Sequence, residues 1–486
     1  MNDRADMGRS GFAPSLAAWY GAHAGLLAAV ILVPVWLRAA LHRYHNSDLG
    51  YFAQALRSIR WDDLNPYLPA RDLRLFGDHF DPILLLLAPL ARLMEPVHAA
   101  LAIEHAFALL APLPILAVAR RNPALAGFGY AATSYLLFNR AILLAIGFPV
   151  HPTAWAATFI IALAAGLMLR KTWLQVSAAL WLMACKEEFP FAVGALGVGL
   201  LFRRDQRRPG TILLALALAW GIAAFALRPV LVGATADHAA RILGPLRTEP
   251  LETIVARLRS LHYVKPLLQC LIPLSPVILW RIRRRLPPAW PFLLALAPLL
   301  GIRLVGDAWG LHYMPPVAAL LAAALLGPDL AGFPRKYAFA VGALALLVSM
   351  GPITKGFAEY RSFGELASPR MAAIADARRL LLAEPGGAAL IHGNLGPTLS
   401  SRPNVFAIGG WQEASAPPIR YRFFLAETPP HGNPWPRTHA DVSALIAAWR
   451  ADSAVKVLRD DSLVFFAERL GADRAWDPGK ARGESR

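Results

Sequence analysis

The residues of this sequence whose types and spacing could do chemistry are ionisable side chains that adjoin or interrupt apolar stretches. Asp48, Asp78 and Glu187 are the acidic members of this group. Charged groups are costly at membrane depth, so such residues usually mark a polar cavity or pathway. We expect them to lie on one face of the protein with a set of polar neighbours that comprises His79, Asp81, His151, Lys186, Glu188, His312 and Tyr313.

Two acidic patterns leave more than one role open. Asp48 precedes an amphipathic run, where a carboxylate is either the N-cap of a helix or a free functional acid. Asp78 and Asp81 stand three apart around His79, a spacing that could hold a divalent cation such as Mg²⁺ or Mn²⁺, or bind a sugar hydroxyl. Pro82 suits the first turn of a helix, which would make Asp81 its cap.

A third pattern, Lys186-Glu187-Glu188, is followed by Pro190 inside an otherwise apolar stretch. The proline and the charges together predict a break between two helices. The trio is either mutually neutralised at this break or a cation that binds phosphate beside a catalytic acid.

Composition places these residues in a membrane protein. Hydrophobic residues make up 56% of the 486 residues, charged residues only 17%, and the mean hydropathy is +0.43, which is too apolar for an ordinary soluble chain. The net charge of +17 does not indicate nucleic-acid binding, because the basic residues fall in short runs between apolar stretches, as in cytoplasmic loops. These runs are Arg120-Arg121, Arg170-Lys171, Arg203-Arg204, Arg207-Arg208, Arg281 with Arg283 to Arg285, and Arg335-Lys336.

A topology follows when each basic run is placed in the cytoplasm. The apolar segments then alternate in direction and predict about eleven transmembrane helices, with the N-terminus in the cytoplasm and the C-terminus outside. Between Lys171 and Arg203 two short helices are needed, because a single span would put these two basic residues on opposite sides. Residues 82–94 are apolar but short, and we expect them to be re-entrant or interfacial.

The domain organisation follows from where apolar density falls. Residues 1–355 are predicted to form an all-α polytopic bundle with a long first outer loop, 39–97, and residues 356–486 a small α/β domain outside the membrane. In that domain we expect an amphipathic helix over 371–383 and short strands over 388–392, 405–408, 454–458 and 463–467, the last two forming a hairpin.

The motifs occur in an order that resembles the bacterial membrane proteins grouped as domain of unknown function 2079. The resemblance covers roughly residues 44 to 410. Its parts, in chain order, are Asp48-Leu49-Gly50 with Gln54-Ala55-Leu56, Phe76-Gly77-Asp78-His79-Phe80-Asp81-Pro82-Ile83-Leu84, His151-Pro152, Lys186-Glu187-Glu188, His312-Tyr313 and Leu399-Ser400-Ser401-Arg402. The family in turn is similar to the C-type glycosyltransferase (GT-C) fold, whose members carry an essential acid in a long first outer loop.

This resemblance implies a glycosyltransferase of the bacterial inner membrane that takes a sugar from a polyprenyl-phosphate donor in the bilayer to a hydroxyl outside. Asp48 would be the general base, with Asp78 and Glu187 as the other candidate catalytic acids, and His79, Lys186 or His312 would stabilise the departing phosphate. The alternatives are a transporter or lipid flippase, and an envelope-assembly component without chemistry. Polar groups gathered on one side, without repeated halves, favour the transferase over the transporter.

Overall fold

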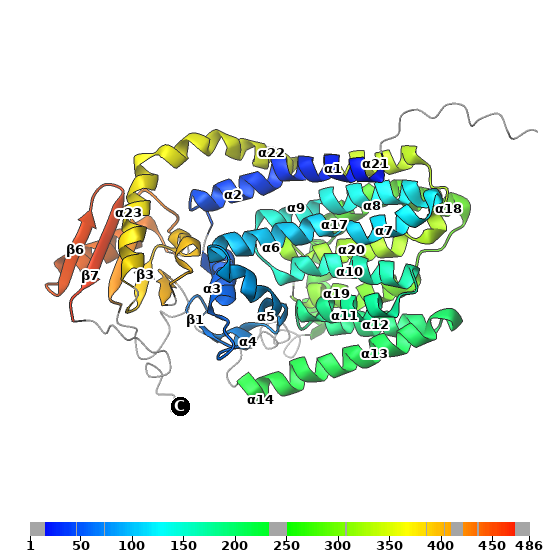
Figure 1. Cartoon of the computed structure of the whole chain (residues 1–486), viewed down its shortest axis with the longest axis horizontal. Helices are drawn as coiled ribbons and strands as arrows, with labels where there is room; N and C mark the ends of the chain where they lie inside the picture. The colour runs from blue at the N-terminus through cyan, green and yellow to red at the C-terminus, as the bar shows by residue number, and fades with distance from the viewer. Residues whose placement is uncertain are drawn as a thin grey trace, which may run out of the picture.

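The computed structural model describes residues 15–44, 46–71, 73–232, 250–306, 309–384, 386–402, 404–409, 421–434 and 437–471. The protein is mostly helical, with 72% of residues in helices. Its helices run side by side along the longest axis of the molecule, and a small sheet lies at one end of this bundle (Figure 1).

The bundle is built from helices that often continue one another through short irregular turns. Their bounds are α1 (Leu16–Leu27), α2 (Val33–Ala40), α6 (Pro96–Leu110), α7 (Leu113–Arg121), α8 (Ala126–Phe138), α9 (Arg140–Gly147), α10 (Pro152–Met168), α11 (Thr172–Ala184), α12 (Phe189–Leu201), α13 (Arg207–Ile222), α14 (Arg228–Val232), α16 (Pro250–Ser260), α17 (Val264–Leu271), α18 (Ser275–Arg284), α19 (Trp290–Gly306), α20 (Pro315–Leu325), α21 (Arg335–Val348) and α22 (Met350–Glu359).

Four helical stretches of the described chain are long and apolar enough to cross a bilayer. They are Leu16–Ala40, Pro96–Arg121, Pro123–Gly147 and Arg204–Val230, and a fifth results if the bent pair Arg335–Val348 and Met350–Ala367 is one span. Several shorter apolar helices lie beside them, among them α10, α11, α12, α19 and α20. Length and composition therefore support four or five spans, fewer than the eleven expected from the basic runs. The predicted break between two short helices is confirmed, because α11 ends at Ala184 and α12 begins at Phe189.

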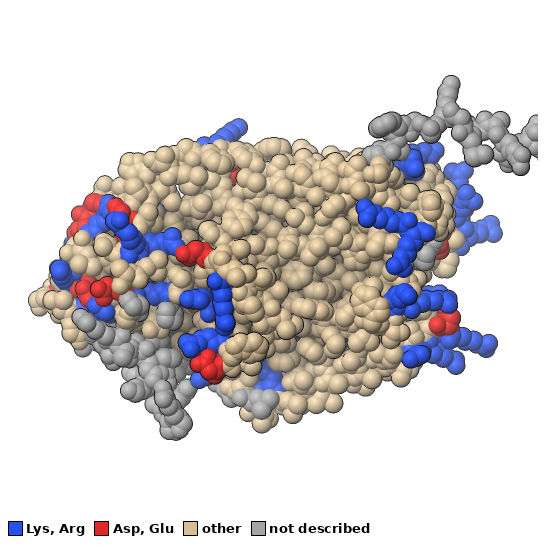
Figure 2. All heavy atoms as spheres, viewed as in Figure 1, with Lys and Arg blue, Asp and Glu red and all other residues tan. Residues whose placement is uncertain are grey.

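The two ends of the bundle differ in charge (Figure 2). Lysine and arginine side chains gather at one end, here called the basic end, while a broad uncharged band covers the middle of the visible face. The opposite end, here called the sheet end, carries charges of both signs. Exposed residues at the basic end are Arg120, Arg121, Arg203, Arg204, Arg207, Arg208 and Arg283 to Arg285. An apolar band with positive charge at one end is typical of a membrane protein and its cytoplasmic side.

Residues 82–94 form a short helical stretch, α5 (Ile83–Leu87) followed by a 3₁₀ turn, Ala88–Arg92. Ten helical residues reach about 15 Å, half the hydrocarbon thickness, so the stretch is too short to cross, in line with a re-entrant or interfacial segment. The expected capping by Asp81 is wrong: Pro82 occupies the N-cap of α5 and no side chain caps it.

The sheet has five strands in the order β4-β3-β5-β7-β6. Their bounds are β3 (Ala389–Ile391), β4 (Val405–Ala407), β5 (Phe423–Glu427), β6 (Val455–Asp460) and β7 (Val464–Arg469). β3 pairs in parallel with β4 and β5, and β7 is antiparallel to both β5 and β6, with a register shift between Val457 and Arg459. The four predicted strands and their hairpin are confirmed; β5 was not predicted.

Each face of this sheet is covered by one helix. Alternate strand residues, such as Phe423 and Phe466, pack with α23 (Pro369–Ala383), the predicted amphipathic helix. Their neighbours Phe424 and Phe465 pack with α24 (His439–Ala451), which was not predicted. Burial on both faces explains why β3, β4, β5 and most of β7 are nearly continuous apolar runs, whereas the edge strand β6 is largely exposed. We call residues 369–471 the sheet unit.

Buried polar contacts join the sheet unit to the loop after α2. The Asn394 amide donates to the His42 carbonyl oxygen at 3.1 Å, and the Thr398 hydroxyl lies 3.2 Å from His42 Nδ1. Beneath them Glu427, fully buried, is held by Arg370 at 2.6 Å. The contact between the sheet unit and the loop after α2 therefore buries polar groups, which lose their hydrating water when the two parts come together.

We expect this junction to weaken in acid. Burial lowers the pKa of His42 from 6.5 to about 4, with Glu427 opposing and Arg370 reinforcing the shift. The unfolded chain therefore binds the proton more readily. The contribution of neutral His42 to the free energy of unfolding is complete above pH 6.5 and is lost as pH falls from 6.5 to about 4, by at most about 3 kcal/mol. Thermal unfolding followed from pH 7.5 to 4 should show this loss, and His42→Gln should flatten it. His98→Gln, an exposed histidine, should leave the profile unchanged; a wild-type profile for His42→Gln would contradict the assignment.

Candidate functional site

A polar cavity of about 270 Å³ lies near the sheet end, where the loops after α2 meet the break between α11 and α12. This volume is just below the range of about 300–1,000 Å³ usual for small-molecule sites. Its lining brings together eight of the residues singled out in the sequence: Asp48, Asp78, His79, Asp81, His151, Lys186, His312 and Tyr313. Arg71, Tyr51 and Cys185 complete its ionisable lining.

Asp48 enters the cavity from a π-helical turn, Asn46–Gly50, that precedes α3 (Tyr51–Ser58). The N-cap of α3 is Gly50 and no side chain caps it, so Asp48 does not fill the capping role considered for it. Instead its Oδ1 atom lies 3.4 Å from Arg71 Nη2 and 3.6 Å from His151 Nε2. The carboxylate therefore faces two potential cations at the cavity wall.

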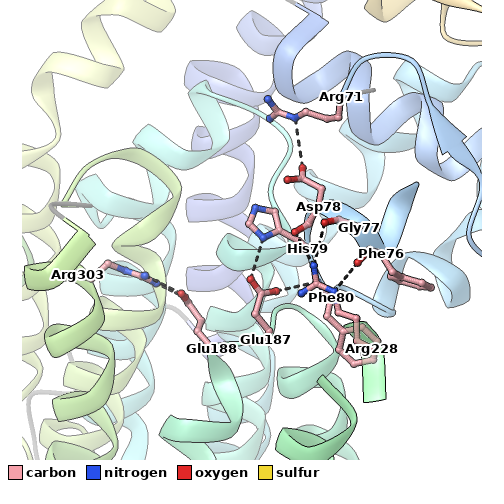
Figure 3. A network of polar contacts seen from close by, with 10 residues as sticks. All are labelled: Arg71, Phe76, Gly77, Asp78, His79, Phe80, Glu187, Glu188, Arg228 and Arg303. Atoms are coloured by element: carbon pink, nitrogen blue, oxygen red, sulfur yellow. Dashed lines mark hydrogen bonds and ion pairs between the residues drawn. The ribbon is translucent and has the colours of Figure 1, made fainter. Parts of the chain in front are cut away.

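Arg71 was not singled out from the sequence, yet it links two of the acids. It follows β1 (Tyr67–Leu68) in a small hairpin with β2 (Leu73–Arg74). Its Nε atom lies 3.5 Å from Asp78 Oδ2 (Figure 3), and its guanidinium stands 5.4 Å above the Tyr51 ring. One cation thus spans Asp48 and Asp78, which reduces the repulsion between the two carboxylates.

His79 and Glu187 meet across the cavity floor (Figure 3). His79 Nδ1 lies 3.0 Å from Glu187 Oε1, and the Phe80 amide donates to Oε2 at 2.9 Å. Burial opposes the charge of Glu187, but His79 and Lys186 hold its pKa below the usual range. Glu187 therefore acts as an ionised anchor beneath His79, and it is not among the residues that line the cavity.

The segment that carries Asp78 and His79 is tied to a distant helix. It begins with α4 (Leu75–Asp78), and Arg228 of α14 donates to the carbonyl oxygens of Phe76, Gly77 and Asp78 at 2.6, 3.2 and 3.0 Å. These carbonyl groups end a single helical turn and have few intrahelical partners. One arginine therefore fixes the backbone that aims Asp78 and His79.

Lys186 and Glu188 leave the helix break in different directions. The Lys186 ammonium reaches the cavity and stands 5.1 Å from the centre of the Tyr313 ring. Glu188 is buried outside the lining, where Arg303 of α19 binds both of its oxygens, one at 2.9 Å (Figure 3). This bidentate pair occupies the Glu188 carboxylate, so the structure places Lys186, and not Glu188, where a substrate could meet it.

Three parallel rings close one side of the cavity. His151 and His312 stack with ring centres 3.6 Å apart, and Phe148 stacks on His151 at 5.2 Å. His151 immediately precedes α10, whose first turn is held by buried Glu104: its Oε2 atom accepts from the His151 amide at 3.2 Å and from the Trp155 indole at 2.5 Å. Glu104 was not singled out, although a carboxylate inside the apolar run of α6 is the same signal that identified Glu187.

Asp81 differs from the other acids of the cavity. It is 2% exposed, and its Oδ1 atom has no hydrogen-bond partner among the described residues. Burial, with Glu187 and Asp78 nearby, raises the pKa of Asp81 well above its usual range. A protonated Asp81 would offer a substrate a hydrogen-bond donor.

The cation site expected at Asp78 and Asp81 is not supported. Within the described part of the chain no group of three or more histidine, cysteine or acidic residues is placed to hold a metal ion. Two carboxylates, one of them favouring its protonated form, are a poor donor set for Mg²⁺ or Mn²⁺, which bind ionised oxygen ligands.

Apolar helices of membrane-crossing length, a charged basic end and a buried polar cavity define a membrane protein. The chain belongs to the family described as predicted membrane protein, domain of unknown function 2079, whose model matches residues 44–329. That range contains every residue of the cavity lining and the Arg228, Glu104 and Arg303 supports. A comparison with curated proteins finds no match.

Proposed function

We propose that the protein transfers a sugar from a polyprenyl-phosphate donor to an acceptor hydroxyl on the outer side of the bacterial inner membrane. The observation that carries the proposal is one cavity lined by an acid, Asp48, together with the cations Lys186 and Arg71, the latter 3.4 Å from Asp48. A base for a hydroxyl and cations for a phosphate are the groups that glycosyl transfer needs. The similarity to the GT-C fold remains a resemblance.

The proposed reaction assigns a role to each group of the cavity. Asp48 accepts the proton of the acceptor hydroxyl, and the oxygen of that hydroxyl forms a bond to the anomeric carbon of the sugar. The bond from that carbon to the phosphate oxygen breaks, and its electron pair leaves with the polyprenyl phosphate. Lys186 and Arg71 stabilise the charge that develops on the phosphate. His79 and a protonated Asp81 bind sugar hydroxyls, and His151, His312 and Tyr313 shape the wall around them.

The proposed topology keeps the N-terminus in the cytoplasm and the sheet unit outside. Support comes from the basic end, where positive charge gathers as it does in cytoplasmic loops. The first described helix, α1, starts toward this end, and the chain reaches the sheet unit at the opposite end after α22 (Figure 1). An odd number of crossings follows, and eleven fits if the shorter apolar helices also span.

A reconstituted transfer assay tests the function. Protein in liposomes is supplied with labelled undecaprenyl-phosphate hexoses and envelope lipids, and release of undecaprenyl phosphate is measured. Lys186→Gln should lower turnover about 10²- to 10³-fold, the usual effect of removing one group that stabilises transition-state charge.

Lys171→Gln, an exposed lysine at the basic end, is the matched control and should keep full turnover. Equal turnover in Lys186→Gln would remove Lys186 from the mechanism. If the wild-type protein consumes none of the donors but moves them between leaflets, the protein is a flippase and the transferase proposal is wrong.

A further inference from the structure

A second, mainly apolar crevice of about 200 Å³ opens between α2, α9 and α22. Its apolar lining includes Ile31, Val35, Leu143 and Leu144. At this crevice α22 lies close to the turn that precedes α2 because Gly356 has no side chain; a Cβ atom there would lie 1.8 Å from the Val30 carbonyl oxygen. Neighbouring α22 residues such as Phe357, 54% exposed, face outward, so the crevice opens on the apolar flank of the bundle.

The polar groups of this crevice lie toward its sheet end. Arg38 near the end of α2 donates to the Gly147 carbonyl oxygen at 3.3 Å and lies 3.5 Å from Glu359. Glu359 also binds Arg43 at 2.7 Å. Exposed Lys355 has no ion-pair partner among the described residues, which leaves its positive charge available at the crevice mouth.

Phe148 connects the crevice with the polar cavity. It lines the crevice, and its ring stacks on His151 at 5.2 Å and on His312 at 6.2 Å, both of which line the cavity. The stacked rings of Phe148, His151 and His312 therefore separate an apolar slot from a polar cavity lined by Lys186 and Arg71.

We propose that this crevice binds the chain of a polyprenyl phosphate. Lys355 and Arg38 then lie near the phosphate of this lipid, and Phe148 lies between the phosphate and the cavity. The occupant follows from three observations: an apolar slot, unneutralised positive charge at its mouth, and a position beside the polar cavity, where Phe148 of the slot stacks on His151 of the cavity. The inference rests on the proposed function for the fate of the lipid, but binding itself is measured without transfer.

Native mass spectrometry of the full-length protein in detergent tests the site, with undecaprenyl phosphate as the probe. Leu144→Trp, which fills the slot, and Lys355→Gln, which removes the charge, should each weaken binding about tenfold. The matched controls are Leu347→Trp, an exposed leucine outside the crevice, and Lys336→Gln, an exposed lysine of the basic end. Both controls should bind undecaprenyl phosphate as the wild type does. Thermal unfolding of all four variants checks that each is folded.

Two lipids identify what the crevice selects. Undecaprenol, which lacks the phosphate, and phosphatidylglycerol, which has two acyl chains and one negative charge, should each bind at least about tenfold more weakly than undecaprenyl phosphate. Unchanged binding in Leu144→Trp and Lys355→Gln, or equal binding of phosphatidylglycerol, would overturn the proposal. Crevice-dependent binding without any sugar transfer would instead overturn only the proposed function, and transfer that survives both crevice substitutions would overturn only this inference.

Discussion

Asp48→Asn should lower sugar transfer about a hundredfold or more, the usual scale for the loss of a general base, while the amount of folded protein stays near wild type. The amide keeps the size of the side chain and can still accept a hydrogen bond from Arg71, but it cannot take a proton from a hydroxyl. Because Gly50 is the N-cap of α3, the substitution removes no helix cap. The measurement is turnover in the liposome assay, with abundance measured in the membrane fraction.

Asp62→Asn provides the matched control, since Asp62 lies in the same loop, is 71% exposed and pairs with its neighbour Arg60 at 3.1 Å. It should keep full turnover. Full activity in Asp48→Asn would move the search for the base to Asp78, Asp81 and Glu187. If none of those substitutions lowers turnover, the transferase proposal fails.

Arg303→Leu should destabilise the protein by about 3–5 kcal/mol, the scale expected when one partner of a buried ion pair is removed. Arg303 is 1% exposed and Glu188 7%, so the remaining carboxylate would be left among apolar helices without its partner. The measurement is the midpoint of thermal unfolding in detergent, together with the fraction of monodisperse protein.

The double variant Glu188→Leu with Arg303→Leu separates charge burial from packing. It should recover most of the lost stability, because replacing both partners removes the unpaired charge. Arg259→Leu, at an exposed position of α16, should change little. A double variant as unstable as Arg303→Leu alone would show that shape, and not charge, holds α12 against α19.

Much of the arrangement around the cavity could be predicted because single residues violate an apolar background. The break at Lys186 follows from the need to keep basic runs on one side, and the structure has it between α11 and α12. The same alternation of spans predicted that Asp48, His151 and His312 lie on one face of the protein. These residues are far apart in the chain but line one cavity. Their roles in catalysis stay predictions.

The residues that hold the site in place were harder to find. Arg71 and Arg228 resemble ordinary loop and interfacial arginines, and only the tertiary fold shows that they bind Asp78 and the carbonyl groups before it. Glu104 is recognisable in the sequence as a carboxylate inside the apolar run of α6, although it was not predicted. The number of crossings also stays open, because hydropathy cannot distinguish a short embedded helix such as α20 from a span. β5 was missed although Phe423 and Phe424 mark an apolar run.

The order of the five strands has a consequence for neighbouring copies of the protein crowded on one membrane surface. The open edges of a sheet are β-pairing templates, here β4 and β6. β4 is only three residues long, and its Val405 carbonyl oxygen already accepts from Gln54 at 3.2 Å. β6 carries Lys456 and Arg459 and a register shift beside the latter. Shortness, charge and irregularity protect both edges, so two copies held side by side in a bilayer should collide without fusing their sheets.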